Sequence, residues 1–452
     1  MPEIFIWRQM LKIKLTAPSI FGFDFIIFFA VEFLMVIGIF FIYSSGVNSN
    51  GVIVTNEFIK QIIWVSTGTF IMLFFAFMDY RRLRGLALPL YLLTILLMVL
   101  TVLFGQVVNG ARSWLGIGSL GIQPSEISKL TTILFLSSYL NNNRNRISSL
   151  WVFMTAFIII LIPMGIVLMQ PDLGTAMVFI PVFLITMFIA GGKKRYILFI
   201  LFTGILTILF SILPYWEMFI ASTKINSMII FTDMRLMKIL CTVTAVLIVL
   251  SVMGYILARK PYFYIMFYSF TIFGISYIFS FAARMVLKDY QVMRLIVFMD
   301  PQVDPKGAGW NIIQSLTAVG SGGAFGKGFL QGTQSHYRYL PEQSTDFIFS
   351  IISEEIGFVG NLVIICLFAI IFWRCLNIII KSRDVFGSLI AAGMVGMIFF
   401  HFMINIGMAI GIMPITGIPL LFLSYGGSSL WTTLLGIGIL LSIYHRRYKN
   451  TN

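Results

Sequence analysis

The sequence predicts an all-α protein that crosses a membrane many times. Of its 452 residues, 59% are hydrophobic and 11% are charged, whereas soluble domains carry roughly 25% charged residues. The apolar residues gather into long runs, and many basic residues gather into the short stretches between them. Because no polar stretch is long enough to form a separate domain, we expect residues 1–452 to form a single membrane domain.

About twelve apolar runs are long enough, or nearly long enough, to cross about 30 Å of hydrocarbon as helices. They lie near residues 25–43, 62–79, 86–105, 127–141, 149–169, 174–191, 196–214, 236–258, 262–282, 346–373, 385–412 and 427–444. The first run ends at Tyr43 without the small-residue pattern of a cleavage site, so we expect no cleavable signal peptide.

The basic residues predict how the chain is oriented. More than half of the 31 lysines and arginines fall in alternate short connections or at the ends of the chain, such as Arg81–Arg84, Lys193–Arg195 and Arg446–Lys449. An excess of Lys and Arg in short loops marks the cytoplasmic side. We therefore expect both termini inside, and we interpret the net charge of +14 as orienting the protein among membrane lipids rather than as binding nucleic acid.

Two segments on the opposite side are too long for simple connectors. They cover about residues 106–125 and 284–345, and loops longer than about 15 residues are usually functional or disordered. The second is rich in glycine, aromatic and apolar residues rather than charge, which argues against disorder. We expect it to fold back against the helices, to form a short amphipathic helix over 310–319, and to carry the catalytic machinery.

The first outer segment ends in Gln123-Pro-Ser-Glu-Ile-Ser-Lys129. Pro124 suits the first turn of a helix, and Glu126 would lie near its N-terminus, where the helix dipole favours an anion. Lys129 lies three residues on, on the same helical face. An ionisable residue inside a membrane is costly and usually faces a cavity or a partner, so Lys129 predicts a functional cavity, whereas capping alone would explain Glu126.

Other polar residues outside the spans have simpler explanations. Asp172 suits the cap of the helix that follows it, and Trp114 suits an anchor at the membrane interface. The run Gly320–Gly328 resembles a phosphate loop only superficially, because it lacks the first glycine and the hydroxyl residue of that signature, whose places Ser321 and Gly328 occupy.

The sequence shows no pattern for a metal, a cofactor or a hydrolase. The three histidines are widely separated, no His, Cys and acidic cluster has metal-ligand spacing, and no nucleophile elbow is present. No cofactor is evident, and a requirement for a divalent cation stays open. What remains is a set of outer carboxylates with Lys and Arg nearby, which suits general-base chemistry on a substrate whose diphosphate needs neutralisation.

Seven short motifs then identify a family. In order from Asn109 to Ser429 they read N-G-A-R-S-W, Q-P-S-E-x-x-K, Q-P-D-L-G-T, D-P-x-x-D-P-x-G-A-G, Q-S-x-x-A-x-G-S-G-G, L-P-E-Q-x-T-D-F-I-F and P-x-T-G-x-P-L-L-F-L-S-Y-G-G-S-S. Together they resemble the RodA/FtsW (SEDS) family of peptidoglycan polymerases. Gly332–Ser335 resembles the RodA branch, which implies lateral-wall elongation and rod shape rather than septal synthesis.

The resemblance implies a peptidoglycan glycosyltransferase of the bacterial cytoplasmic (inner) membrane. SEDS proteins polymerise lipid II on the outer face of that membrane and work with a class B penicillin-binding protein as transpeptidase. The donor bond is α and the product is β-1,4, so the anomeric centre inverts, which suits direct displacement with one general base. The family's essential carboxylate maps to Asp304, and Asp300 ranks second.

The resemblance also implies roles for other residues. Glu126 and Lys129 match a polar pair that faces the central cavity, where Lys129 would hold the diphosphate. Weaker candidates for substrate contacts or loop anchoring are Asp172, Arg294 and Lys327, and Trp114 is a further candidate for substrate binding. Family members usually have ten spans, so two helices between about residues 215 and 281 are expected to be an inserted pair, either a partner surface or a lipid-facing appendage.

Two other classes of function stay open from the residues. A lipid II flippase or transporter would use a buried Glu126 and Lys129 equally well, and a scaffold for the transpeptidase would leave Asp304 without a role. The polymerase is favoured because the acidic motifs concentrate in the outer loops rather than along a path through the membrane.

Overall fold

The computed structural model describes residues 22–108, 111–117, 120–221 and 226–447. The chain divides into two compact units, one made of Met1–Lys193 with Gln314–Asn452 and the other of Lys194–Ile313. Each unit is described by itself. The helix α12 (Trp310–Ser321) contains the point where the chain passes from the second unit back to the first.

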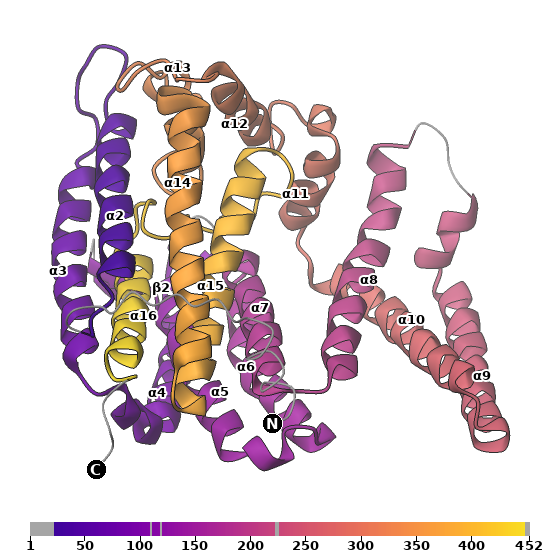
Figure 1. The fold of residues 1–452 in the computed structure, drawn as a ribbon. Helices are drawn as coiled ribbons and strands as arrows, with labels where there is room; N and C mark the ends of the chain where they lie inside the picture. The colour runs from indigo at the N-terminus through magenta and orange to yellow at the C-terminus, as the bar shows by residue number, and fades with distance from the viewer. Residues whose placement is uncertain (1–21, 109–110, 118–119, 222–225, 448–452) are drawn as a thin grey trace. The chain divides into compact units, whose positions relative to one another are not determined.

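The first unit is a bundle of long helices with a small sheet (Figure 1). Its elements are α2 (Phe25–Ser45), α3 (Glu57–Phe77), η1 (Tyr80–Arg82), α4 (Leu83–Phe104), β1 (Gln106–Val108), β2 (Ala111–Ile117), β3 (Leu120–Ile122), α5 (Pro124–Asn142), η2 (Arg144–Arg146), α6 (Leu150–Met169), α7 (Leu173–Ala190), α13 (Thr333–His336), α14 (Ile348–Lys381), α15 (Val385–Ala409) and α16 (Gly427–His445).

The second unit is helical throughout its described residues. Its elements are α8 (Lys194–Phe219), η3 (Asn226–Phe231), α9 (Met234–Ala258), α10 (Pro261–Val286), α11 (Asp289–Met299) and η4 (Pro301–Val303). Helices α8 and α10 pack through a cluster of buried aromatic rings centred on Phe210, Tyr277 and Phe281. Only 11% of the apolar stretch of α9 is buried, so most of its apolar surface is available to lipid.

The expected fold class is confirmed, since eleven helices of the described residues are long and apolar enough to cross a membrane. The expected span over 127–141 is α5, which is absent from those eleven. This helix contacts α4, α6, α7, α15 and α16, and most of its 19 residues are buried. Because protein rather than lipid surrounds it, α5 tolerates the polar side chains that lower its hydropathy.

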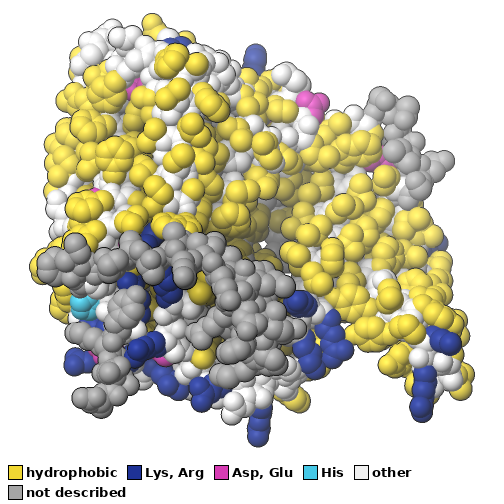
Figure 2. Space-filling model, viewed as in Figure 1, with side chains coloured by type: hydrophobic (Ala, Val, Ile, Leu, Met, Phe, Trp, Pro, Cys, Tyr) yellow, Lys and Arg dark blue, Asp and Glu magenta, His cyan; other side chains and the backbone are white. Residues whose placement is uncertain are grey.

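Hydrophobic side chains cover the visible sides of both units, and most visible Lys and Arg lie at one end of each (Figure 2). This is the distribution that a bilayer imposes, because lipid tails accept apolar side chains while charges remain at the membrane surface.

The segment over 106–125 contains an antiparallel sheet that the sequence did not predict. Its order is β1-β2-β3, with Gln106 opposite Trp114 and Leu115 opposite Ile122. Two of the strands have only three residues each, which is too short for the alternating pattern by which a strand is recognised. The expected amphipathic helix over 310–319 is confirmed as α12.

Helix α14 is broken at Gly357, whose φ of +66° is outside the helical region. The glycine segment (Gly320–Gly328) fills the break. Its Lys327 and Gly328 N–H groups donate to the carbonyls of Glu354 and Glu355, at 2.9 Å each, and its Gly323 and Ala324 carbonyls accept from Phe358 and Val359 at 2.9 and 3.1 Å. Backbone groups freed by the break are thereby satisfied, as a helix in lipid requires.

Candidate active site

The buried polar centre of the first unit begins at the N-terminus of α5. Pro124 is its first residue, and the N–H of Glu126 donates to the Gln123 carbonyl at 3.0 Å. One turn on, the Lys129 Nζ lies 2.8 Å from the Glu126 Oε1. Lys129 is 2% exposed and Glu126 is 4% exposed. The predicted pairing on one helical face is therefore present in the structure, and the pair is buried.

His401 of α15 is a third member of this centre. Its Nε2 lies 3.2 Å from the Lys129 Nζ, and its Nδ1 lies 3.0 Å from the Pro419 carbonyl oxygen. A carbonyl only accepts, so Nδ1 carries the proton and Nε2 is left to accept from the ammonium. No local pattern points to this residue, because it lies 272 positions from Lys129 and belongs to no cluster with metal-ligand spacing.

Asp172 lies beside Gln123 at the start of α5 and caps α7, as predicted. Its Oδ1 accepts from the Thr175 N–H at 3.0 Å, and its Oδ2 accepts from the Gln123 side chain at 3.3 Å. Desolvation raises the pKa of the Asp172 carboxyl above its ordinary value, and the charge of Glu126 adds to that rise, while the Thr175 hydrogen bonds and Lys129 oppose it.

Gln123 joins three helix N-termini. Its side chain reaches Asp172 at the start of α7, and its backbone N–H donates to the Ser428 hydroxyl in the first turn of α16 at 3.2 Å. The starts of α5, α7 and α16 therefore converge. Partial positive charge from three helix dipoles collects there, close to the Lys129 ammonium, and such a place suits an anion.

Lys327 is held as a loop anchor. Its Nζ lies 2.7 Å from the Glu354 Oε1 and 2.8 Å from the Thr333 hydroxyl. The same carboxylate accepts from the backbone N–H groups of Thr333 and Gln334. Lys327 thus ties the glycine segment to α13 and α14, which is one of its two expected roles; a contact with substrate stays a prediction.

Trp114 belongs to β2 and packs within the small sheet. A Cβ added at Gly121 of the facing strand would lie 3.0 Å from its ring, so the ring covers the backbone of β3. This packing explains Trp114 as part of the sheet, and neither the interface anchor nor the substrate contact is tested by it.

Asp304 lies in the second unit, in the turn before α12. Its Oδ1 accepts from the Gly307 N–H at 3.0 Å, and its Oδ2 accepts from the Ala308 N–H at 2.8 Å. Because each oxygen has a second lone pair, the carboxylate can also accept a proton or a hydrogen bond from outside. The two amides fix the orientation of the group, as positioning of a base requires.

The remaining predicted residues of the long loop are also in the second unit. Asp300 caps η4, since its Oδ1 accepts from the Gln302 N–H at 2.9 Å. Arg294 of α11 lies over the ring of Tyr290, one turn earlier, at 5.6 Å from the ring centre. The predicted site residues are therefore divided, with Trp114, Glu126, Lys129, Asp172 and Lys327 in one unit and Arg294, Asp300 and Asp304 in the other.

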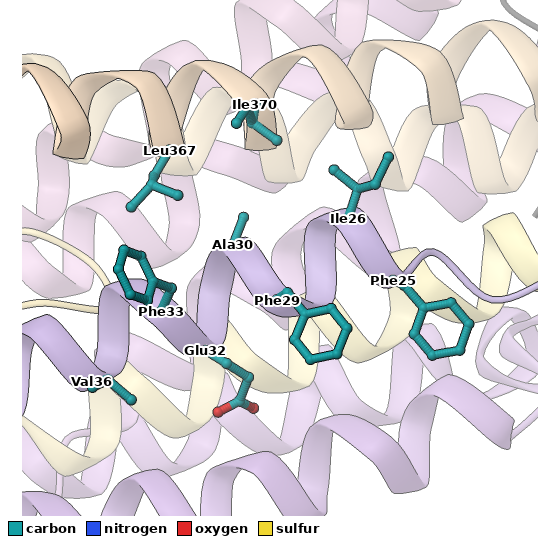
Figure 3. Close-up of a pocket in the computed structure, with 9 residues that line it drawn as sticks. All are labelled: Phe25, Ile26, Phe29, Ala30, Glu32, Phe33, Val36, Leu367 and Ile370. Carbon is teal, nitrogen blue, oxygen red and sulfur yellow. The ribbon is translucent and has the colours of Figure 1, made fainter. Parts of the chain in front are cut away.

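A groove lies apart from these residues, between α2 and α14 (Figure 3). Its volume is about 630 Å³, and it is lined by Phe25, Ile26, Phe29, Ala30, Glu32, Phe33, Val36, Leu367 and Ile370. The Glu32 carboxylate accepts from the Thr69 hydroxyl at 2.8 Å. An otherwise apolar lining suits hydrocarbon and offers too few polar groups to bind a sugar. Among the described residues, no group of three or more His, Cys, Asp or Glu could hold a metal ion.

A family model described as a cell cycle protein, covering FtsW, RodA and SpoVE, matches residues 24–233 and 213–449. The peptidoglycan glycosyltransferase RodA of Treponema pallidum is 47% identical over 426 residues, which cover 94% of this chain and 98% of that protein. Stage V sporulation protein E of Bacillus subtilis is 31% identical over 95% of this chain and 98% of its own. The peptidoglycan glycosyltransferase MrdB of Escherichia coli is 32% identical over 86% and 85%.

Two solved structures are similar over nearly the whole chain. One, described as showing structural coordination of polymerization and crosslinking by a peptidoglycan synthase complex, has a TM-score of 0.64 and 25% identity, and covers 95% of this chain and 99% of its own. The rod shape determining protein RodA of Thermus thermophilus has a TM-score of 0.59 and 23% identity, over 96% and 100%. The second likeness bears on the fold alone.

Proposed function

The chain belongs to the FtsW, RodA and SpoVE family and is a peptidoglycan glycosyltransferase, and we propose that it polymerises lipid II into β-1,4-linked glycan strands for cell-wall elongation. The observation that carries the substrate assignment is the buried cation Lys129 beside three converging helix N-termini. A diphosphate is the part of lipid II that needs such a site, because its negative charge must be balanced away from water.

We propose that Asp304 is the general base. In the reaction the acceptor 4-hydroxyl attacks the anomeric carbon of the donor, a C–O bond forms, and the bond from that carbon to the diphosphate breaks. Asp304 takes the hydroxyl proton, and undecaprenyl diphosphate leaves as the anion that Lys129 and the helix N-termini would stabilise. A single displacement of this kind inverts the anomeric centre, as the change from an α donor to a β product demands.

The proposed place of the reaction is the outer face of the bacterial cytoplasmic membrane, with both chain termini inside. The excess of Lys and Arg in alternate short loops supports this orientation. We also propose that a class B penicillin-binding protein works with the chain as transpeptidase. The similarity to a structure described by polymerization and crosslinking in one complex supports that partnership.

A lipid II transporter is the second candidate, because the Glu126, Lys129 and His401 side chains form a polar centre inside a membrane bundle. Intramembrane ionisable residues of this kind also mark transport paths. Septal synthesis is a variant of the first proposal, since the chain is also similar to FtsW proteins, at 30% identity over 85% of its length in one case.

Purified protein incubated with labelled lipid II separates these candidates. A polymerase yields glycan chains in detergent with no membrane to cross, and the yield rises when the transpeptidase partner is added. A transporter leaves lipid II unpolymerised in detergent and moves it between the leaflets of a vesicle. Absence of polymer with and without the partner would overturn the proposed function.

A further inference from the structure

Lys129 has two partners, and the second one has no place in the proposed chemistry. Glu126 balances its charge, whereas His401 is neutral in the tautomer that the Pro419 contact selects. His401 is 1% exposed and lies on α15, away from the helix that carries the ion pair. A neutral imidazole does little to balance the charge of Lys129, so the contribution of His401 is to orient the Lys129 ammonium.

We propose that His401 is a positioning residue, which accepts a hydrogen bond from Lys129 and so fixes the direction in which the ammonium offers its remaining N–H. An ammonium has three N–H groups, and the described residues supply Glu126 and His401 as partners for two of them. Two bonds to separate helices set the rotation about the Cε–Nζ bond. The third N–H then points in one direction, where a diphosphate oxygen would accept it.

The position of His401 is itself set from the opposite side of its ring. The Nδ1 donates to the Pro419 carbonyl, and Asn405, one turn along α15, donates to the Ile418 carbonyl at 2.8 Å and the Asp346 carbonyl at 2.8 Å. The segment Ile418–Pro419 is therefore fastened to α15 at two neighbouring points. Because His401 contacts both Pro419 and Lys129, the position of the Ile418–Pro419 segment relative to α15 affects the orientation of Lys129.

The inference rests on the proposed role of Lys129, and two conservative variants test it by separating the two ring nitrogens. In His401→Gln the amide end reaches the place of Nε2 and keeps an acceptor for Lys129. In His401→Asn the shorter amide reaches the place of Nδ1 and keeps a donor for Pro419. His401→Leu keeps neither.

We expect polymerisation by His401→Gln within about threefold of the unmodified chain, and losses of about 10- to 100-fold in His401→Asn and His401→Leu, since a small misplacement of a catalytic group can cost about 10²-fold. The loss should fall on kcat more than on KM.

The opposite ranking, with His401→Asn active and His401→Gln inactive, would overturn the inference and leave His401 as a support of the Pro419 segment. Polymer made by the unmodified chain tests the proposed function separately. If that chain made none, the same ranking would be read from the thermal stabilisation of each variant by undecaprenyl diphosphate.

Discussion

Lys129 is buried beside two polar side chains, Glu126 of its own helix α5 and His401 of α15. Carrying a charge out of water costs several kcal/mol, and removing one member of a buried pair leaves the other uncompensated. Asp24 and Arg374 form a second buried pair at 2.6 Å, in which the guanidinium also lies 5.0 Å from the centre of the Tyr444 ring. That pair encloses its cation between protein groups, whereas Lys129 keeps an N–H for a ligand in our proposal.

Substitutions in the pair of Lys129 and Glu126 should affect stability and polymerisation separately. Lys129→Met alone leaves Glu126 buried and unpaired, so we expect a loss of stability of up to about 3–5 kcal/mol together with loss of polymerisation. Adding Glu126→Gln removes the uncompensated charge. The double variant should therefore recover its melting temperature in a thermal unfolding assay, yet remain inactive with lipid II.

Polymerisation at the normal rate by Lys129→Met would show that the diphosphate does not depend on this cation. If the double variant recovered activity as well as stability, the pair would be structural only.

Asp304 predicts a loss of rate with little loss of structure. A positioned base contributes about 10²–10⁴-fold, so Asp304→Asn should lower glycan formation from lipid II by that factor. Both carboxylate oxygens accept backbone N–H groups, and an amide can replace only one of them. A local cost of about 1 kcal/mol is therefore expected, and the folded fraction must be measured beside the rate.

Asp300→Asn is the matched control for that variant, because Asp300 also caps a turn through one backbone N–H. We expect Asp300→Asn to polymerise lipid II at close to the normal rate. A defect in Asp300→Asn with normal activity in Asp304→Asn would move the general base to Asp300.

The broken helix α14 and the glycine segment are joined by backbone hydrogen bonds and support each other. The break exposes carbonyls at Glu354 and Glu355, and the glycine segment supplies the N–H groups for them. Close approach of two backbones explains why the segment is rich in glycine: a Cβ at Gly326 would lie 2.1 Å from the Glu355 carbonyl oxygen. Lys327, which the sequence suggested as a substrate contact or a loop anchor, adds a side-chain contact between the glycine segment and Glu354 of α14.

Gly326→Ala should therefore destabilise the outer end of the bundle. Gly326 has a φ of +79°, so a side chain is strained there as well as obstructed, and we expect a cost of more than about 1 kcal/mol. The measurement is the melting temperature in detergent. Gly320→Ala serves as the control, because a Cβ at Gly320 meets nothing within 4 Å and alanine favours a helix interior by about 0.5–1 kcal/mol. Equal melting temperatures for the two variants would show that close packing of the glycine segment in the break of α14 does not stabilise the protein.

The whole molecule combines a helical bundle with a second helical unit, and both expose apolar side chains on their visible sides (Figure 2). The family match is split into residues 24–233 and 213–449. Both parts of the match extend into the stretch 215–281, so the match does not test the prediction that a helix pair is inserted there. The exposed apolar surface of α9 favours contact with lipid for this pair.

The orientation of the whole chain predicts which residues can be labelled from each side. In a variant without Cys241, Cys366 and Cys375, Lys193→Cys should react with an impermeant thiol reagent only from the cytoplasmic side, and Lys306→Cys only from outside. Both positions are exposed, so lack of reaction would report the membrane rather than burial. Reaction of Lys193→Cys from outside would reject the proposed orientation.

The class of protein, the approximate spans and the pairing of Glu126 with Lys129 could all be predicted from the amino-acid sequence. These features depend on hydropathy and helical periodicity, which are patterns of residues that lie close together in the sequence. Its motifs were also enough to identify the family. Asp172 was correctly expected to cap its helix for the same reason, because a cap acts within three residues of its own position.

The contacts between segments that are distant in the sequence become visible only in the folded chain. Folding brought His401 to Lys129, placed the glycine segment in the break of α14, and joined the starts of α5, α7 and α16 through Gln123. No local pattern encodes such contacts, since a backbone carbonyl such as that of Pro419 or Glu355 is chemically the same at every position. Which donor reaches it depends on the packing of the helices, and packing is a property of the folded chain as a whole.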